Sequence, residues 1–146
     1  MKELITVRTR VLIIFFIGCQ FILIGQKNVC LPVPQKFIKK INKCKFENNP
    51  QKKINELTKI LGKFPNQAQV YFEIGEYYRI TGISALKRNS SPTEGEQNLK
   101  KAIYFYQKSI QKCRGFDYRN YLNLGNILLS FENEKEALVC FKEVVS

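Results

Sequence analysis

Residues 121–145 read YLNLGNILLSFENEKEALVCFKEVV, and they determine the architecture that we expect. Apolar side chains recur at intervals of three and four on both sides of Glu132-Asn133, which predicts two helices joined by a tight turn. Gly125 on the first helix and Ala137 on the second are small, so the two helices can approach where a larger side chain would collide. Phe141 then fills the space between them.

The same spacing occurs upstream, in two halves that about 15 extra residues separate. Residues 71–78 repeat the order of residues 121–128, and residues 102–109 repeat the order of residues 137–144. The matching positions are Tyr71, Ile74, Gly75, Tyr78, Ala102, Tyr106 and Ser109. An internal repeat of this kind predicts helix pairs that must stack on one another to bury their apolar faces.

These positions resemble the tetratricopeptide repeat (TPR), whose pattern is an aromatic, Leu-Gly, a second aromatic and then Ala-x-x-x-Phe. The resemblance covers residues 34–146 and implies an all-α fold, a right-handed stack of about three antiparallel helix pairs. The repeats would be residues 34–67, 68–117 and 118–146. The first is degenerate, because Phe37 takes the aromatic position but Lys40-Ile41 replaces Leu-Gly.

Turn residues divide residues 34–146 into six expected helices. The breaks fall at Asn48-Asn49-Pro50, Phe64-Pro65-Asn66, Thr81-Gly82, Arg114-Gly115 and Glu132-Asn133. Residues 83–98 contain LKRNSSPTEGEQ, a composition typical of an exposed loop. We interpret this segment as an insert in the second repeat, either a tolerated insertion or a loop that docks a partner. A short Gly-Ser turn in place of residues 84–97 should then leave the fold intact.

The resemblance also implies a binding surface, because TPR stacks bind ligands on the concave face formed by the first helix of each pair. Carried over to this sequence, the groove positions are Gln35, Ile38, Asn42, Lys45, Gln69, Phe72, Glu76, Arg79, Arg119, Leu122, Asn126 and Leu129. Some TPR domains clamp a C-terminal carboxylate with Lys, Asn and Arg side chains. Only Arg119 and Asn126 suit that role here, and Glu76 would repel a carboxylate, so we reject the clamp.

Residues 1–25 have the form of a secretory signal peptide, with three basic residues before an apolar run over residues 11–25. That run is shorter than the roughly 20 residues needed to span a bilayer. Cleavage after Gly25 would leave residues 26–33 as a linker, and the loss of three basic residues and Glu3 would lower the net charge from +12 to +10. An uncleaved anchor, a buried core helix and a lipoprotein signal at Cys19 remain alternatives. We expect an exported protein, periplasmic or secreted, or one anchored by residues 11–25.

Four cysteines follow the expected cleavage site, and an even number permits disulfides in an oxidising compartment. A bridge between Cys30 and Cys44 is conceivable if the linker folds back along the first helix. Cys113 lies near an expected helix end, and Cys140 beside Phe141 is expected to be a small buried hydrophobic residue. No Cys-x-x-Cys pair is present, which argues against metal and thioredoxin-like sites.

The composition restricts the chemistry that the chain can perform. Its 146 residues, 45% of them hydrophobic, are typical of one folded domain. It contains no His, which excludes Ser-His-Asp and Cys-His catalysis and His-ligated metal sites. Glu76 and Arg79 are three residues apart, so we expect a surface ion pair there and not a catalytic site. We predict no catalytic residue, no metal and no cofactor.

The function that we predict is a scaffold or adaptor that holds another protein or peptide in the groove. Export argues against nucleic acid as the partner. The positive charge would suit an acidic protein or an anionic envelope surface, and a solvated lysine-rich helix face is the simpler interpretation. The alternatives are the N-terminal part of a larger envelope protein or a membrane-anchored adaptor and, less favoured, a small-molecule-binding protein or an enzyme.

The last repeat also predicts an interface. Its apolar residues cannot all face the preceding repeat, so some should form an exposed patch: Leu128, Leu129, Leu138 and Val145. Exposed apolar patches usually mark interfaces. We therefore expect self-association through this repeat, or docking of a partner or a further domain there.

Overall fold

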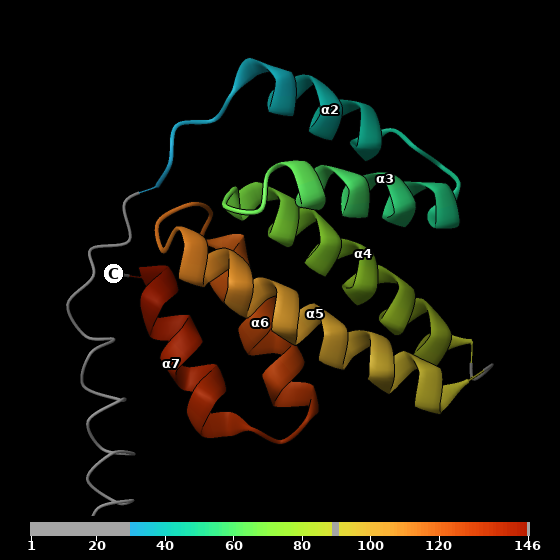
Figure 1. Cartoon of the computed structure of the whole chain (residues 1–146). Coiled ribbons are helices and arrows are strands. Elements are labelled where there is room, and N and C mark those ends of the chain that lie inside the picture. Colours follow the sequence, from blue (N-terminus) through green and yellow to red (C-terminus); the bar gives the residue numbers. More distant parts are fainter. Residues whose placement is uncertain (1–29, 89–90, 146) are drawn as a thin grey trace, which may run out of the picture.

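The computed structural model describes residues 30–88 and 91–145, and that part of the chain contains six α-helices and no strand. Helices that follow one another in sequence pack side by side (Figure 1). They are α2 (Gln35–Lys45), α3 (Pro50–Lys63), α4 (Ala68–Lys87), α5 (Pro92–Lys112), α6 (Arg119–Ser130) and α7 (Glu134–Val145). The predicted all-α class is thus confirmed, whereas the predictions for residues 1–25 lie outside the described residues. None of these six helices is long and apolar enough to cross a bilayer.

Local side-chain chemistry sets the helix ends. Asn49 precedes α3 and accepts a hydrogen bond from the backbone N of Lys52 at 2.9 Å, with Pro50 as the first helical residue. Ser91 does the same for Glu94 at the start of α5. Glu132, between α6 and α7, has a φ of 58° in the left-handed region, which ends α6. The breaks predicted at residues 48–50, 64–66, 114–115 and 132–133 are confirmed.

The break predicted at Thr81-Gly82 is wrong, because α4 continues through it to Lys87. Gly82 is buried where α4 crosses α5, and a Cβ atom there would lie 3.0 Å from the carbonyl oxygen of Gly95. A Cβ atom on Gly95 would in turn lie 2.6 Å from Cγ of Leu86. The two glycines therefore permit a close helix crossing and do not form a turn. Residues 83–87 and 92–98 are helical, so a Gly-Ser turn in place of residues 84–97 would remove packed structure, including the buried Ala85.

Two hydrophobic clusters form the core, and Tyr78 packs against both. The first joins α2, α3 and the start of α4 through Phe37, Ile41, Cys44, Leu57, Ile60, Val70 and Ile74. The second joins α4 to α7 through Phe72, Leu99, Ala102, Tyr106, Tyr121, Leu124, Ile127, Leu128, Ala137 and Cys140. The burial predicted for Cys140 is confirmed.

The close approach predicted at two glycines is also present. A Cβ atom on Gly75 would lie 2.9 Å from Cε1 of Tyr106, and one on Gly125 would lie 2.6 Å from Cε1 of Phe141. In both helix pairs, therefore, a glycine of the first helix packs under an aromatic ring of the second.

Most of the apolar residues that the sequence predicts to be exposed on the last helix pair are exposed, and Leu128 is the exception. Ala137 and Cys140 form the buried face of α7, whereas Leu138 and Val145 are exposed. On α6, Leu129 is exposed and Leu128 is buried. Three of the four residues predicted to form an exposed patch are therefore open to solvent.

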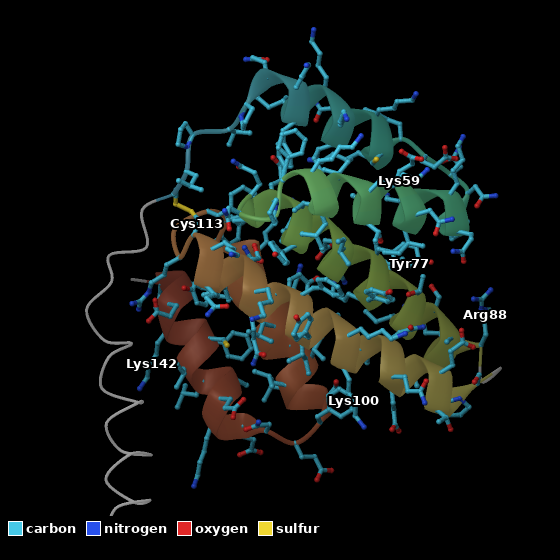
Figure 2. All side chains as sticks on the ribbon, viewed as in Figure 1. Lys59, Tyr77, Arg88, Lys100, Cys113 and Lys142 are labelled. Atoms are coloured by element: carbon cyan, nitrogen blue, oxygen red, sulfur yellow. A yellow bond between two sulfur atoms is a disulfide. The ribbon has the colours of Figure 1, made fainter. Side chains whose placement is uncertain are left out.

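The disulfide is a correction to the sequence interpretation, because Cys30 bonds to Cys113 and not to Cys44 (Figure 2). The Cα atoms of Cys30 and Cys113 are 4.8 Å apart. The segment before α2 does not fold back along that helix; it runs past the start of α4, where the Gln67 amide donates to the carbonyl oxygen of Pro32 at 3.2 Å. It thereby reaches the end of α5, while Cys44 is a buried free thiol.

Candidate functional site

A cleft of about 330 Å³ lies between α4 and α6, over one side chain of α5. We call it the α4–α6 groove, and the residues that line it are Arg79, Ile83, Leu86, Lys87, Leu99, Asn123, Asn126, Ile127 and Ser130. Four of these side chains are aliphatic, two are cationic and three are neutral hydrogen-bonding groups. Apolar walls with a few polar groups are the usual composition of a binding pocket.

The C-terminal part of α4 forms one wall of this groove, because α4 is longer than α6. Gly75 and Gly125 occupy matching positions in the two helix pairs. From these positions α4 continues twelve residues to Lys87, whereas α6 continues five residues to Ser130. Seven further residues add about 10 Å of helix. Ile83, Leu86 and Lys87 lie on this extension.

Glu76 is the centre of a polar cluster beside the groove. The amide of Asn123 on α6 donates to Oε1 of Glu76 at 2.6 Å, and Arg79 donates to both carboxylate oxygens, from Nη2 at 2.8 Å and Nε at 3.2 Å. The hydroxyl of Tyr106 on α5 also donates to Oε1. One carboxylate therefore connects α4, α5 and α6. The ion pair predicted between Glu76 and Arg79 is confirmed, although both side chains are half-buried and not on an open surface.

The charge state of this cluster follows from its contacts. Burial acts to raise the pKa of Glu76, but hydrogen bonds from Arg79 and Tyr106 and the charge of Arg79 outweigh it, so the pKa lies below its usual range. Burial, followed by the hydrogen bond to Glu76, raises the pKa of Tyr106. Glu76 is therefore ionised at neutral pH, with Tyr106 protonated as its donor.

We expect Glu76→Gln to lower the free energy of unfolding by about 1–2 kcal/mol at neutral pH, because it removes the charge that three donors surround. The pKa of Glu76 is lower in the folded protein than in the unfolded chain, where it is about 4.3. The ionised carboxylate therefore stabilises the fold at pH values above about 4.3, and this contribution is lost as the pH falls through the folded-state pKa. The difference between wild type and variant should therefore shrink in acid. Urea unfolding followed by circular dichroism at several pH values measures it.

Glu96→Gln is the matched control, because Glu96 is exposed on α5. It should leave stability close to that of wild type at every pH. A Glu76→Gln difference that stays constant into acid would contradict the role assigned to the ionised carboxylate.

The groove residues predicted from the sequence are distributed over several environments. Arg79 and Asn126 line the α4–α6 groove. Phe72 does not, because it is only 4% exposed and packs in the core, with the Arg119 guanidinium 5.1 Å above its ring. Leu122 is exposed on α6, like Leu129.

The remaining predicted positions lie away from the groove. Gln69 is half-buried at the start of α4 and lines a small cavity beside the disulfide. Lys45 forms an ion pair with Glu73 of α4 at 3.1 Å. The other three lie on α2: Gln35, Ile38 and Asn42.

Arg119 is already engaged within the protein. Its guanidinium donates from Nη2 to Asp117 Oδ2 at 2.6 Å and from Nε to Oδ1 at 3.0 Å. These hydrogen bonds lower the pKa of Asp117. An arginine paired in this way is a further argument against a carboxylate clamp.

The sequence prediction missed seven residues that line the groove, all on helices that it had placed or interrupted: Ile83, Leu86, Lys87, Leu99, Asn123, Ile127 and Ser130. The available signal was the helical spacing of Arg79, Ile83 and Leu86, which continues past Gly82.

Three or more acidic or Cys side chains that could hold a metal ion do not come together within residues 30–88 and 91–145. The chain matches no protein-family model, no curated protein and no solved structure. The geometry of the groove is therefore the basis for the functional argument.

Proposed function

We propose that this protein is an exported, TPR-like adaptor that binds a segment of another protein in the α4–α6 groove. The observation that carries this proposal is the groove itself, which combines aliphatic walls with polar groups at its rim. A protein partner fits better than a small polar molecule because the walls Ile83, Leu86 and Ile127 offer mainly apolar contact.

Two features support the TPR-like part of the proposal. The contacts of Gly75 with Tyr106 and of Gly125 with Phe141 repeat one packing arrangement in successive helix pairs. The first helices of the pairs also contact one another, through Lys45–Glu73 and Asn123–Glu76. Stacked pairs with adjacent first helices are the arrangement in which TPR proteins form their binding surface.

The groove chemistry suggests which peptides would bind. An aliphatic or aromatic side chain would fill the space between Ile83 and Ile127. Asn126 is exposed at the rim and offers a donor and an acceptor to a peptide backbone. Lys87 is exposed at the end of the wall and would favour an acidic residue next to the apolar anchor.

The disulfide between Cys30 and Cys113 supports export, because structural disulfides persist mainly in oxidising compartments. Retention of residues 11–25 would make the same protein a membrane-anchored adaptor. The N-terminal residue of the protein recovered from its native source, determined by mass spectrometry, distinguishes the two forms.

Self-association through Leu129, Leu138 and Val145 also remains a proposal. It would be withdrawn if the chain sediments as a monomer at high concentration.

Binding is tested with peptides selected from a random display library against the full chain. We expect selected peptides to share an apolar anchor with a neighbouring acidic residue. Asn126→Trp should weaken their binding at least about tenfold, because the indole would fill the groove. Gln97→Trp, at an exposed site of α5 outside the α4–α6 groove, should leave the affinity unchanged.

Fluorescence polarisation with labelled peptide measures both affinities. If both variants bind like wild type, the peptides contact another surface and the groove is not the binding site. If selection gives no peptide that binds the wild-type chain, the adaptor proposal itself fails.

A further inference from the structure

Positive charge is concentrated at one edge of the molecule. Residues 30–67, which contain α2 and α3, hold nine lysines and two glutamates, a net charge of +7. Residues 68–146 hold eleven basic and nine acidic residues, a net charge of only +2. The α2–α3 edge is therefore the part of the described structure that most strongly attracts anions.

Five of these lysines line one cleft of about 350 Å³ between α2 and α3: Lys40, Lys43, Lys52, Lys59 and Lys63. Lys36 and Lys39 precede Lys40 and Lys43 by four residues each, so they extend the same side of α2. Figure 2 shows nitrogen-tipped side chains that project from α2 away from the other helices.

Ion pairs neutralise only part of this charge. Glu47 pairs with Lys52 at 2.7 Å, and Glu56 pairs with Lys59 at 2.9 Å. Among the residues that the structure describes, the other three cleft lysines form no ion pair: Lys40, Lys43 and Lys63. The cleft thus retains unpaired cations around a floor formed by Cys44 and Ile60.

Exposed apolar residues lie at both ends of α2. Phe46, directly after the helix, is 83% exposed and follows Lys43 and Lys45. Leu31 and Val33, before the helix, are also exposed. A row of lysines with exposed apolar side chains is typical of surfaces that lie against a membrane interface, because lysine stems and aromatic rings enter the interface while ammonium groups meet headgroups.

We propose that the α2–α3 edge docks onto an anionic lipid bilayer, with its lysines against the headgroups and Phe46 inserted at the interface. The kind of basic residue on this edge favours a bilayer over an acidic protein as its binding partner. All nine basic residues between positions 30 and 67 are lysines and none is arginine. Protein interfaces are enriched in arginine and depleted in lysine, whereas clustered lysines act as point charges toward a diffuse anionic surface.

The position in the sequence fits this surface. The apolar run over residues 11–25 ends shortly before α2 begins at Gln35. In the membrane-anchored form, which would retain residues 11–25, nearby basic residues would strengthen attachment to an anionic leaflet. The apolar run would bind anionic and neutral lipid alike. The test must therefore separate attraction by charge from binding through this run.

Co-sedimentation of the full chain with vesicles makes that separation. Vesicles of phosphatidylcholine alone are compared with vesicles containing about 30% phosphatidylglycerol. We expect at least about tenfold tighter binding to the anionic vesicles at about 100 mM salt, and most of this preference should disappear at about 500 mM.

A variant with glutamine at Lys36, Lys39, Lys40 and Lys43 should lose most of the preference. A control of equal charge change on other helices should keep most of it: Lys87, Lys100, Lys135 and Lys142, each replaced with glutamine. Asn126→Trp should also keep it, so that failure here is distinct from failure of the groove proposal. Circular dichroism establishes that each variant is folded.

Phe46→Trp gives a second readout, because the chain contains no Trp. Its fluorescence should shift to shorter wavelength with anionic vesicles and not with neutral ones. Tyr118→Trp, at an exposed site before α6, should show no shift. Three results would each overturn the proposal. The chain could bind both kinds of vesicle equally, or the two lysine variants could lose the preference to the same extent. The third is an unshifted spectrum of the Phe46→Trp variant with anionic vesicles. The same holds if the edge binds acidic protein but no vesicle.

Discussion

Gly75→Leu is expected to lower the free energy of unfolding by about 4 kcal/mol, and Gly125→Leu by about 2–3 kcal/mol. A Cβ atom at either position would already collide with an aromatic ring, and leucine adds three more carbon atoms. The order of the two effects follows from the rings. Tyr106, over Gly75, is fully buried and hydrogen-bonded to Glu76, so it has no space to move. Phe141, over Gly125, is only half-buried and can swing outward.

Gly62→Leu provides the control for helix propensity. Gly62 is exposed on α3, and a Cβ atom there would meet no other atom within 4 Å. Leucine should stabilise the helix there by a few tenths of a kcal/mol, because it has a higher helix propensity than glycine. Thermal unfolding followed by circular dichroism ranks the three variants. Melting temperatures for Gly75→Leu and Gly125→Leu close to that of wild type would show that the helices do not pack as described.

Loss of the disulfide should have an effect of similar size. Cys30 and Cys113 are 83 residues apart in sequence. On the chain-entropy account, a cross-link over a loop of this length lowers the entropy of the unfolded chain and so raises the free energy of unfolding by about 4.5 kcal/mol. Cys30→Ser is the preferred variant, because Cys30 is exposed and its replacement leaves no cavity. Urea unfolding should give a midpoint well below that of wild type.

A reducing agent supplies the control for this experiment. It should lower the midpoint of the wild-type protein to that of Cys30→Ser and should leave the variant itself unchanged. Peptide mapping of the oxidised protein should find Cys30 joined to Cys113. A wild-type midpoint insensitive to reduction, or a Cys30–Cys44 peptide, would contradict the pairing.

Local patterns were sufficient to predict most of the helices. The Asn49-Pro50 start of α3 and the turn at Glu132-Asn133 each depend on residues within one helical turn of the break. Gly82 was misread because glycine serves two purposes, a turn or a close helix crossing. Its partner Gly95 lies in a polar stretch that looks like a loop until α4 and α5 are placed together.

The candidate site was harder to predict, because one of its walls lies on the part of α4 beyond Gly82. With α4 ended at Gly82, the wall formed by Ile83 and Leu86 was assigned to an insert, and only Arg79 and Asn126 of the groove were identified. The disulfide had a different obstacle. Four cysteines can pair in three ways, and the choice depends on the path of the irregular segment before α2, for which sequence periodicity gives no information.

The bond between Cys30 and Cys113 also divides the molecule mechanically. It closes a covalent ring that contains α2, α3, α4 and α5, whereas α6 and α7 lie outside it. Tension between the N-terminal segment and α7 would pass through the sulfur atoms and bypass the ring, so α6 and α7 would yield first. Since the groove has one wall on α4 and the other on α6, such tension would separate its walls. A peptide bound there would be released by force while most of the protein stayed folded.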